Sequence, residues 1–578
     1  MFADIIVYLK IPVGVLTYRI SSDIANDIKF GQIVQVDFRG KKAFGLVVDF
    51  RKNAQDLSYK IKNIIKIIDS TPLSNTYIDL IKWVSEYYTS SLSESLTSAV
   101  PSPPSKLKDV INSTNMTVAS GEKKSFLVIG DKLSRWKNYI KIIEKAIASN
   151  TQTLICLPQI EDVNKFCELI PKKISFTKYY SGLTKLKKYK IYQESKTNTY
   201  NVICGVRNTV FLPLPNLKMI IIDEEEAISH HSDQKPYLST SKIAEWLAKS
   251  RNLNLVYGNV VPSVKQWGKL KKKKINLITN RNFLFSLEKI KLKLFSTSKG
   301  SFINPSIFDE INKTKGEVFL FVPRQYYSQF VKCSDCENII RCKKCQRVLN
   351  AINHFLSCQN CGFEMAMPEN CPACNGTNLK IVGVKSENIY NELFKNISIN
   401  KEKVTVGGLV ELDAIQDKKF ELVAVVGLDI LLGILAYNQE EKVISTLFKL
   451  ASVTKESLII QTNKMENKIM QTFSQKNIIN FLDEALEIRR KHNLPPFGIA
   501  AEVSSRGKTA DESLNIMNKF VNSAEKFGGI EILGPYEKLD FRKDSMHYFQ
   551  IFIKFNTEKQ KTHLIKNLNK DLFFQIHE

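Results

Sequence analysis

The sequence predicts an α/β protein organised around parallel β-sheets. Short, continuously apolar segments such as 126–129, 219–222 and 422–426 have the composition of buried strands, and segments with helical spacing lie between them. This alternation is typical of a doubly wound parallel sheet with helices on both faces. The length of 578 residues corresponds to roughly four domains, at about 150 residues per domain.

The first 104 residues have a different pattern, that of a small β-rich domain. Residues 33–38 alternate between apolar and polar side chains, and residues 45–48 follow them across the turn at 39–41, which predicts a hairpin. Residues 77–88 then have helical spacing. The prolines of segment 101–104 predict a linker to the first α/β stretch.

Further segments follow the first predicted strand. We expect a helix from about Arg135 to Ser149, and we interpret the Lys-rich segment 269–274 as a solvated linker. The second α/β stretch begins at 318 and is interrupted by a cysteine-rich block. A helix near 511–527 and a later strand at 548–553 predict a final α+β domain.

Charge and hydropathy restrict the class of protein. The chain has 83 Lys and Arg against 58 Asp and Glu, a net charge of +25, which favours a polyanionic partner, although a generally Lys-rich proteome would give the same excess. The longest apolar segment, 422–437, contains Asp429 and is shorter than the roughly 20 residues that a bilayer requires. The first residues carry no signal-peptide pattern, so we expect no membrane partner and a cytoplasmic location.

Eight of the eleven cysteines form the most specific motif, which consists of four Cys-x2-Cys pairs. The pairs are Cys333 and Cys336, Cys342 and Cys345, Cys358 and Cys361, and Cys371 and Cys374. Because Zn²⁺ binds four thiolates in a tetrahedron, the spacing predicts two closed, structural zinc sites. Redox cysteines and an iron–sulfur cluster are the alternatives. The sequence does not fix which pairs share an ion. We prefer a nested arrangement, with the first and last pairs on one ion and the two inner pairs on the other.

The chain resembles the PriA family of bacterial replication-restart helicases, also called primosomal protein N-prime. The cysteine array has nearly the spacing of that family's two-zinc insertion, segment 320–327 is similar to the family's LFLNRRGY, and segment 382–387 is similar to its GxGTER. Shorter similarities lie at Trp83 with Glu86-Tyr87-Tyr88, at Leu16-Thr17-Tyr18, at 494–497 and at 533–535.

The resemblance implies two RecA-like helicase lobes with a zinc insertion, between a small N-terminal domain and an α+β C-terminal domain. We expect a 3′-end DNA-binding domain at 1–104, a degenerate helicase lobe 1 at 105–268, the start of lobe 2 at 269–330, a zinc-binding module at 331–382, the remainder of lobe 2 at 383–490 and the C-terminal domain at 491–578. The family's winged-helix domain is missing from this prediction, because only about 20 residues separate Pro104 from Phe126.

The resemblance places a phosphate-binding loop directly after the strand at 126–129, where segment 130–137 reads Gly-Asp-Lys-Leu-Ser-Arg-Trp-Lys. Leu133 and Arg135 stand in place of glycines that let backbone amides close on phosphate, and Trp136 stands in place of the family's lysine. Asp131 adds a negative charge where phosphate would lie. We therefore expect that ATP does not bind.

The remaining motor motifs are also reduced. Asp223 and Glu224 match the family's acid motif and would hold Mg²⁺ only if a nucleotide bound; we prefer the interpretation that they are a vestigial, structural acidic cluster. Between 446 and 459 the arginine-finger motif of lobe 2 is missing, and the only cations are Lys449 and Lys455. We expect neither catalytic nor cofactor-binding residues, and neither ATP nor Mg²⁺ as a cofactor.

The N-terminal domain offers groups for DNA binding. The resemblance places the pocket for a 3′-terminal nucleotide at Leu16, Thr17, Gly40 and Lys62. The rings of Tyr18 and Phe38 are expected to stack on a base. A solvated basic hairpin is the alternative interpretation.

These observations are compatible with three functions. The preferred hypothesis is a primosome-assembly protein that recognises stalled forks or D-loops and helps recruit the replicative helicase, without ATPase or helicase activity. The alternatives are an active ATP-dependent 3′–5′ DNA helicase and a zinc-stabilised nucleic-acid-binding adaptor outside replication. The expected partners are forked or single-stranded DNA with a 3′ end, primosome proteins and single-stranded DNA-binding protein.

Overall fold

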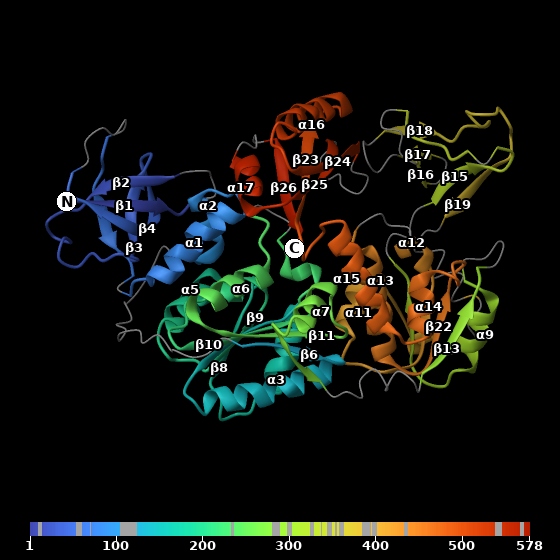
Figure 1. Cartoon of the computed structure of the whole chain (residues 1–578), viewed down its shortest axis with the longest axis horizontal. Helices are drawn as coiled ribbons and strands as arrows, with labels where there is room; N and C mark the ends of the chain where they lie inside the picture. Colours follow the sequence, from blue (N-terminus) through green and yellow to red (C-terminus); the bar gives the residue numbers. More distant parts are fainter. Residues whose placement is uncertain are drawn as a thin grey trace. The chain divides into compact units, whose positions relative to one another are not determined.

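The computed structural model describes residues 1–9, 14–53, 60–69, 71–104, 124–232, 236–279, 290–297, 303–323, 329–336, 338–343, 349–352, 355–357, 363–383, 395, 401–432, 437–537, 546–566 and 571–577. The chain forms two compact units, shown in Figure 1: residues 1–262 with 269–279, and residues 263–268 with 280–578. Within the described residues, no helix has both the length and the apolar character of a membrane span.

The first unit begins with a five-stranded antiparallel sheet in the order β2-β1-β4-β3-β5. Its strands are β1 (Phe2–Val7), β2 (Val15–Arg19), β3 (Ile33–Phe38), β4 (Lys41–Arg51) and β5 (Ile64–Ile67). The predicted hairpin is confirmed, since β3 and β4 pair with Phe38 opposite Lys41. The two loop residues, Arg39 and Gly40, have φ angles of 51° and 79°, which is the left-handed geometry of the tight turns that join twisted strands.

Two helices, α1 (Asn75–Tyr87) and α2 (Leu92–Ala99), follow this sheet and pack on the adjoining α/β lobe of the same unit. Ser91 caps α2 by accepting a hydrogen bond from the Glu94 backbone, and the Glu94 side chain accepts one from the Ser91 backbone in return. The Trp83 ring of α1 stacks on Trp246 with 5.7 Å between centroids. The N-terminal domain is thereby joined to the lobe by buried side chains.

Lobe 1 is a seven-stranded parallel sheet in the order β12-β6-β11-β10-β7-β9-β8. The strands are β6 (Ser125–Ile129), β7 (Gln152–Cys156), β8 (Phe176–Tyr179), β9 (Val202–Gly205), β10 (Leu217–Asp223), β11 (Asn254–Asn259) and β12 (Asn276–Thr279). The helices are α3 (Lys132–Ile147), α4 (Ile160–Glu168), α5 (Lys185–Ser195) and α6 (Thr240–Arg251), while the residues of α7 (Val264–Lys271) are divided between the two units after Gly268.

Two local predictions in lobe 1 need correction. Helix α3 begins at Lys132 rather than near Arg135, because the Asp131 side chain caps it by accepting a hydrogen bond from Ser134 N at 3.0 Å. The segment 269–274 is not simply a solvated linker, since α7 extends through Lys271. Lys269 on α7 forms an ion pair with Glu245 at 2.6 Å.

Lobe 2, in the second unit, is a five-stranded parallel sheet in the order β13-β22-β21-β14-β20. The strands are β13 (Lys291–Phe295), β14 (Val318–Phe321), β20 (Val404–Gly407), β21 (Phe420–Val425) and β22 (Thr454–Gln461). The helices are α9 (Pro305–Lys313), α11 (Leu409–Ala414), α12 (Leu428–Leu432), α13 (Gln439–Val453), α14 (Lys468–Ser474) and α15 (Ile478–Lys491). The prediction of two parallel α/β lobes is confirmed.

Two antiparallel sheets complete the second unit. The cysteine-rich segment forms the order β18-β17-β16-β15-β19, with β15 (Gln329–Cys333), β16 (Asn350–Ile352), β17 (Phe355–Ser357), β18 (Glu364–Ala366) and β19 (Leu379–Gly383). The last segment forms the order β24-β25-β23-β26, with β23 (Ile499–Gly507), β24 (Ile530–Glu537), β25 (His547–Phe555) and β26 (Leu572–His577). Helices α16 (Ala510–Ala524) and α17 (Glu558–Lys566) belong to this α+β segment, and Met517 and Phe520 of α16 pack in its core.

Candidate functional sites

Three of the residues expected at the 3′-end pocket lie around Asp37, at the turn of the β3–β4 hairpin. The Asp37 carboxylate accepts hydrogen bonds from Gly40 N at 2.9 Å and from the Lys62 ammonium. The Asp37 carbonyl accepts one from the Tyr18 hydroxyl at 3.1 Å. The Lys62 hydrogen bond, together with that from Gly40, lowers the pKa of Asp37 from its ordinary value. The structure therefore places Gly40 and Lys62 at the Asp37 carboxylate and the Tyr18 hydroxyl at the Asp37 backbone carbonyl.

Burial corrects one expectation for this domain. Tyr18 is only 4% exposed, so its ring lies in the core and is not available to stack on a base. Thr17 is also buried, and its hydroxyl donates to Asp4 Oδ1 at 2.8 Å, while Arg51 binds the other oxygen of Asp4. Leu16 and Phe38 are half-buried.

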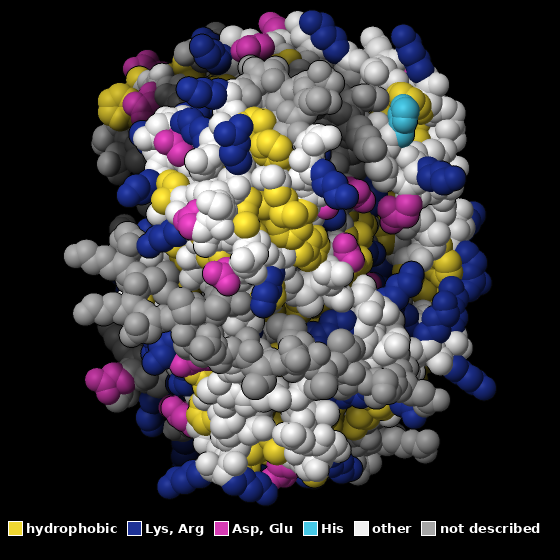
Figure 2. All heavy atoms as spheres, turned by 90° about the vertical axis from the view of Figure 1, so that its left-hand side faces the viewer, with side chains coloured by type: hydrophobic (Ala, Val, Ile, Leu, Met, Phe, Trp, Pro, Cys, Tyr) yellow, Lys and Arg dark blue, Asp and Glu magenta, His cyan; other side chains and the backbone are white. Residues whose placement is uncertain are grey.

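Asp4 and Asp37 were not among the predicted site residues. Each is an acidic residue within a strand of mainly apolar residues, and that contrast was the available signal. Near the hairpin, Arg39, Lys41 and Lys42 are exposed. On the face shown in Figure 2, Lys and Arg side chains are spread among fewer Asp and Glu side chains. The domain thus has accessible cations beside a turn whose geometry is fixed by Asp37.

The acid motif lies at the end of β10, and it is buried and occupied by side chains of α3. Arg135 donates from Nε to Asp223 Oδ1 at 2.7 Å and from Nη2 to Asp223 Oδ2 at 3.2 Å. The same Nη2 contacts Glu224 Oε1 at 3.0 Å. Trp136 Nε1 and the Tyr139 hydroxyl also donate to Asp223, at 3.0 and 2.7 Å. Neither Asp223 nor Arg135 has exposed surface.

The electrostatics of this cluster follow from its burial. Burial alone would lower the pKa of Arg135, but the charges of Asp223 and Glu224 outweigh that effect and raise it. Burial, with the adjacent charge of Asp223, raises the pKa of Tyr139 well above its ordinary value. The guanidinium thus remains charged and neutralises the acid motif from within the protein.

The backbone leaves little space for a phosphate at this edge of the sheet. Only Gly130 and Asp131 separate β6 from α3, so the residues expected to form a phosphate-binding loop lie instead in the first turns of a helix. The Tyr139 hydroxyl lies 1.5 Å from the position that a Cβ on Gly258 would take. Glycine is therefore required at 258 because Tyr139 fills the space beside the acid motif.

The other lysines at the expected motor motifs either form ion pairs with acidic side chains or are exposed to solvent. Lys132 forms a buried ion pair with Asp162 at 2.8 Å, and burial raises the pKa of Asp162 to about 6 although Lys132 opposes the shift. Lys137 is exposed on the outer side of α3. In lobe 2, Lys449 pairs with Asp413 at 2.8 Å and Lys455 pairs with Glu421 at 3.0 Å.

Four cysteines of the cysteine-rich segment lie close together. The sulfur atoms of Cys333, Cys336, Cys371 and Cys374 all lie within 4.8 Å of one another. The distance from Cys333 to Cys374 is 3.6 Å and that from Cys336 to Cys371 is 3.7 Å. A tetrahedral Zn²⁺ with Zn–S bonds of about 2.3 Å requires sulfurs about 3.8 Å apart. The donor set and its spacing therefore fit a closed zinc site.

Backbone N–H groups donate to two of these sulfurs. Asp335 N donates to Cys333 Sγ and Ala373 N donates to Cys371 Sγ, each at 3.4 Å. Backbone donors at 374 and 373 lower the pKa of Cys371 to about 6. Of the two inner pairs, Cys342 is buried, whereas Cys345, Cys358 and Cys361 lie outside the described residues.

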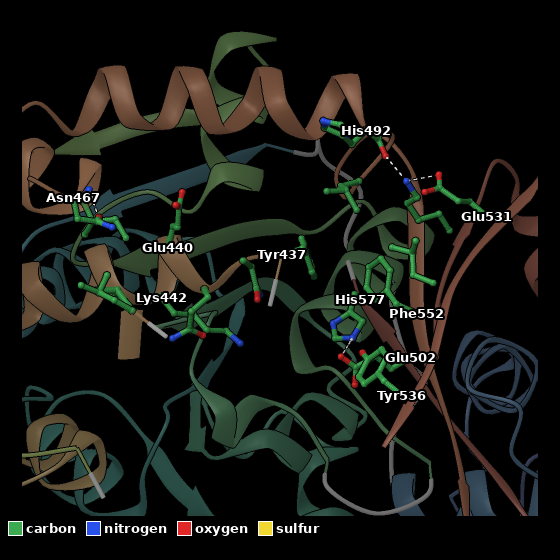
Figure 3. A pocket seen from close by; sticks show the side chains of 18 residues that line it. Tyr437, Glu440, Lys442, Asn467, His492, Glu502, Glu531, Tyr536, Phe552 and His577 are labelled. Carbon is green, nitrogen blue, oxygen red and sulfur yellow. Dashed lines mark hydrogen bonds and ion pairs between the residues drawn. The ribbon is translucent and has the colours of Figure 1, made fainter. Parts of the chain in front are cut away.

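The second unit also contains a cavity of about 710 Å³, lined by lobe 2 and the C-terminal sheet (Figure 3). His577 pairs with Glu502 at 3.1 Å, and Lys554 binds Glu531 and the His492 carbonyl. The lining has three Glu side chains and only two Lys side chains. Because an anion requires the opposite balance, we assign neither a phosphate nor a nucleotide to this cavity.

Comparisons with known proteins identify the family. A family model described as the 3′ DNA-binding domain of PriA matches residues 4–101. The Replication restart protein PriA of Rickettsia prowazekii is 26% identical, and the match covers 94% of both chains. These similarities support membership of the PriA family. The PriA protein of Borreliella burgdorferi is 24% identical over 86% of this chain and 84% of its own.

More distant members and solved structures extend the comparison. The PriA protein of Bacillus subtilis is 23% identical over 78% of this chain and 62% of its own. Among solved structures, RecG bound to a three-way DNA junction covers 74% of this chain and 48% of its own, at 10% identity and a TM-score of 0.34. A DEAD box protein from Methanococcus jannaschii covers 63% and 86%, at 12% identity and a TM-score of 0.29.

Proposed function

We propose that this PriA family member is a DNA-binding replication-restart protein without ATPase or helicase activity. It recognises branched DNA with a 3′ end, such as stalled forks or D-loops, and helps to recruit the replicative helicase. Its partners are primosome proteins and single-stranded DNA-binding protein.

The observation that carries the loss of ATPase activity is the position of the Arg135 guanidinium on Asp223 and Glu224. Phosphoryl transfer requires an acid pair that can hold Mg²⁺ and a cradle that holds the triphosphate. Here the acid pair is buried and already bound to a cation of the chain itself. Binding of Mg²⁺-ATP would have to expel a buried guanidinium that makes four contacts with Asp223, Glu224 and Gly130.

The restart role is supported by the match of residues 4–101 to the 3′ DNA-binding domain and by relatives that bear the name replication restart protein. The exposed cations beside the Asp37 turn supply phosphate contacts. Two structural zinc ions complete the proposal. Cys333, Cys336, Cys371 and Cys374 hold one ion, and Cys342, Cys345, Cys358 and Cys361 hold the other.

The test of the lost motor measures Mg²⁺-ATP binding and DNA-stimulated hydrolysis by the purified full chain. We expect neither. Tight Mg²⁺-ATP binding together with DNA-stimulated turnover would show that the active-helicase alternative is right.

The test of DNA recognition compares forks with a free 3′ end, forks with a blocked 3′ end, blunt duplex and RNA at one salt concentration. We expect the free 3′ end to be preferred. Lys62→Ala should reduce that preference, whereas Lys66→Ala, an exposed lysine on the neighbouring strand β5, should not. Equal affinity for RNA and forks would instead favour an adaptor outside replication.

A further inference from the structure

Helix α5, which is labelled in Figure 1, belongs to lobe 1. It begins within an unusually basic stretch of the chain. Residues 169–200 contain eight Lys and a single acidic residue, Glu194. Across the whole chain the ratio of basic to acidic residues is only 83 to 58. A general excess of lysine in the chain therefore does not account for this concentration.

The first half of α5 projects its lysines into solvent. Lys185, Lys187 and Lys190 are exposed and Lys188 is half-buried, while Leu186 between them is 61% exposed. Successive residues of a helix are rotated by about 100°, so these side chains leave the axis in several directions. The second half of α5 is anchored instead, with Ile191 and Tyr192 buried.

Within the described part of the lobe, one ion pair partly compensates the charge of this turn. Lys190 pairs with Glu194 at 3.7 Å, but within the described residues no acidic side chain pairs with Lys185, Lys187 or Lys188. Cations in the first turn of a helix oppose its dipole, and like charges three residues apart repel each other. The arrangement therefore costs stability, and an anionic partner would offset that cost.

The lysines also lie at the edge of the sheet where α/β proteins bind ligands. Helix α5 follows β8, whose last residue Tyr179 pairs with Gly205 at the end of β9. Since the strands are parallel, this is the edge at which β10 ends with Asp223. The basic turn thus faces the side of lobe 1 on which the vestigial acid motif lies.

We propose that Lys185, Lys187 and Lys188 form a second DNA contact that binds backbone phosphates independently of base sequence. This inference rests on the proposed function, because it locates a further part of the same DNA-binding surface. The three lysines from 185 to 188 span about 4.5 Å along the helix axis, and phosphates on one DNA strand advance along the duplex axis by about 3.4 Å each. The turn therefore matches about two consecutive phosphates on one strand.

The experiment measures the affinity of the full chain for a blunt DNA duplex, which lacks a fork, over a range of salt concentrations. The variant Lys185→Gln/Lys187→Gln/Lys188→Gln removes three charges from α5. The matched control Lys137→Gln/Lys141→Gln/Lys145→Gln removes three exposed charges from α3 of the same lobe. Thermal melting verifies that both variants are folded.

We expect the slope of log affinity against log salt concentration to fall by about two in the α5 variant, at about 0.9 per lost phosphate contact, and to stay near wild type in the α3 control. Equal losses in both variants would mean that net charge alone matters, and the proposal would be wrong. An unchanged slope in the α5 variant would overturn it too and point to an acidic protein partner. If the wild-type chain binds no DNA at all, the proposed function itself fails.

Discussion

At the residue scale, the side chains that occupy the expected phosphate-binding loop form hydrogen bonds and ion pairs within lobe 1. Arg135 and Trp136 stand where the family has a glycine and a lysine, and both now donate to the Asp223 carboxylate. Asp131, which would repel a phosphate, caps α3. The acid motif is thus part of the hydrophobic and ionic core of lobe 1, and Asp223 Oδ1 already accepts hydrogen bonds from Arg135 and Tyr139.

The first prediction follows from this core. Arg135→Met should lower the free energy of unfolding of the first unit by about 3–5 kcal/mol, because it leaves the buried carboxylates of Asp223 and Glu224 without a cation. Denaturant unfolding measures the loss. Lys455→Met removes a cation that is 60% exposed and pairs with Glu421, and it should cost at most about 1 kcal/mol.

A double-mutant cycle isolates the pair. Arg135→Met combined with Asp223→Asn should cost less than the sum of the two single variants, since each single variant leaves a buried charge unpaired. Additive losses would show that the ion pair does not carry the stability of this core.

At the scale of elements, the sequence was sufficient to predict a strand or a turn wherever the pattern depends on neighbouring residues alone. The alternation of residues 33–38 predicted β3 within the observed bounds, and the two-residue turn at Arg39 and Gly40 follows from the hairpin pattern. The preferred nesting of the cysteine pairs agrees with the sulfurs that the structure brings together at one end of the module.

The sequence was insufficient to predict contacts between side chains that lie far apart along the chain. The sequence shows that residue 135 is an arginine where a glycine was expected. It does not show that the guanidinium reaches Asp223 and Glu224, which lie 88 and 89 positions further along the chain. It likewise suggested an available ring at Tyr18, because an aromatic residue in a strand has the same local pattern on either face of a sheet. Which face is buried depends on packing against other elements.

The second prediction concerns the cysteine module. The purified chain should contain two equivalents of zinc by elemental analysis, and Cys333→Ser/Cys371→Ser should retain one, because it removes two of the four thiolates that fit one tetrahedral ion. Amide hydrogen exchange should become faster in β15, which ends at Cys333, and in β19, whose first residue Leu379 pairs with Cys333.

Cys167→Ala is the matched control, since Cys167 is 4% exposed in lobe 1 and remote in sequence from the module. Its zinc content should remain at two. Iron in place of zinc, or a full zinc complement in the double variant, would contradict the assignment.

At the scale of the molecule, the N-terminal domain and lobe 1 behave as one compact unit for identifiable reasons. Lys196 of lobe 1 is buried and binds the Asp69 carboxylate and the Thr71 carbonyl of the N-terminal domain. The Tyr77 hydroxyl donates to the Leu212 carbonyl at 2.9 Å. A DNA end held by the N-terminal domain would therefore keep a fixed relation to the basic turn of α5.

The third prediction tests that rigidity. Lys196→Met removes the cation and leaves Asp69 buried and unpaired. We expect this change to weaken the contact between the N-terminal domain and lobe 1 by about 3–5 kcal/mol of stabilising free energy. We expect the wild-type unit to unfold in one calorimetric transition, and the variant to show an earlier transition with faster hydrogen exchange in β3 and β4. Lys173→Met removes a lysine that is 74% exposed and should leave both measurements unchanged.

If exchange in β3 and β4 rises no more in Lys196→Met than in this control, the buried pair does not couple the domain to the lobe. The two DNA contacts would then move independently, and a fork would be bound by avidity rather than by a fixed spacing.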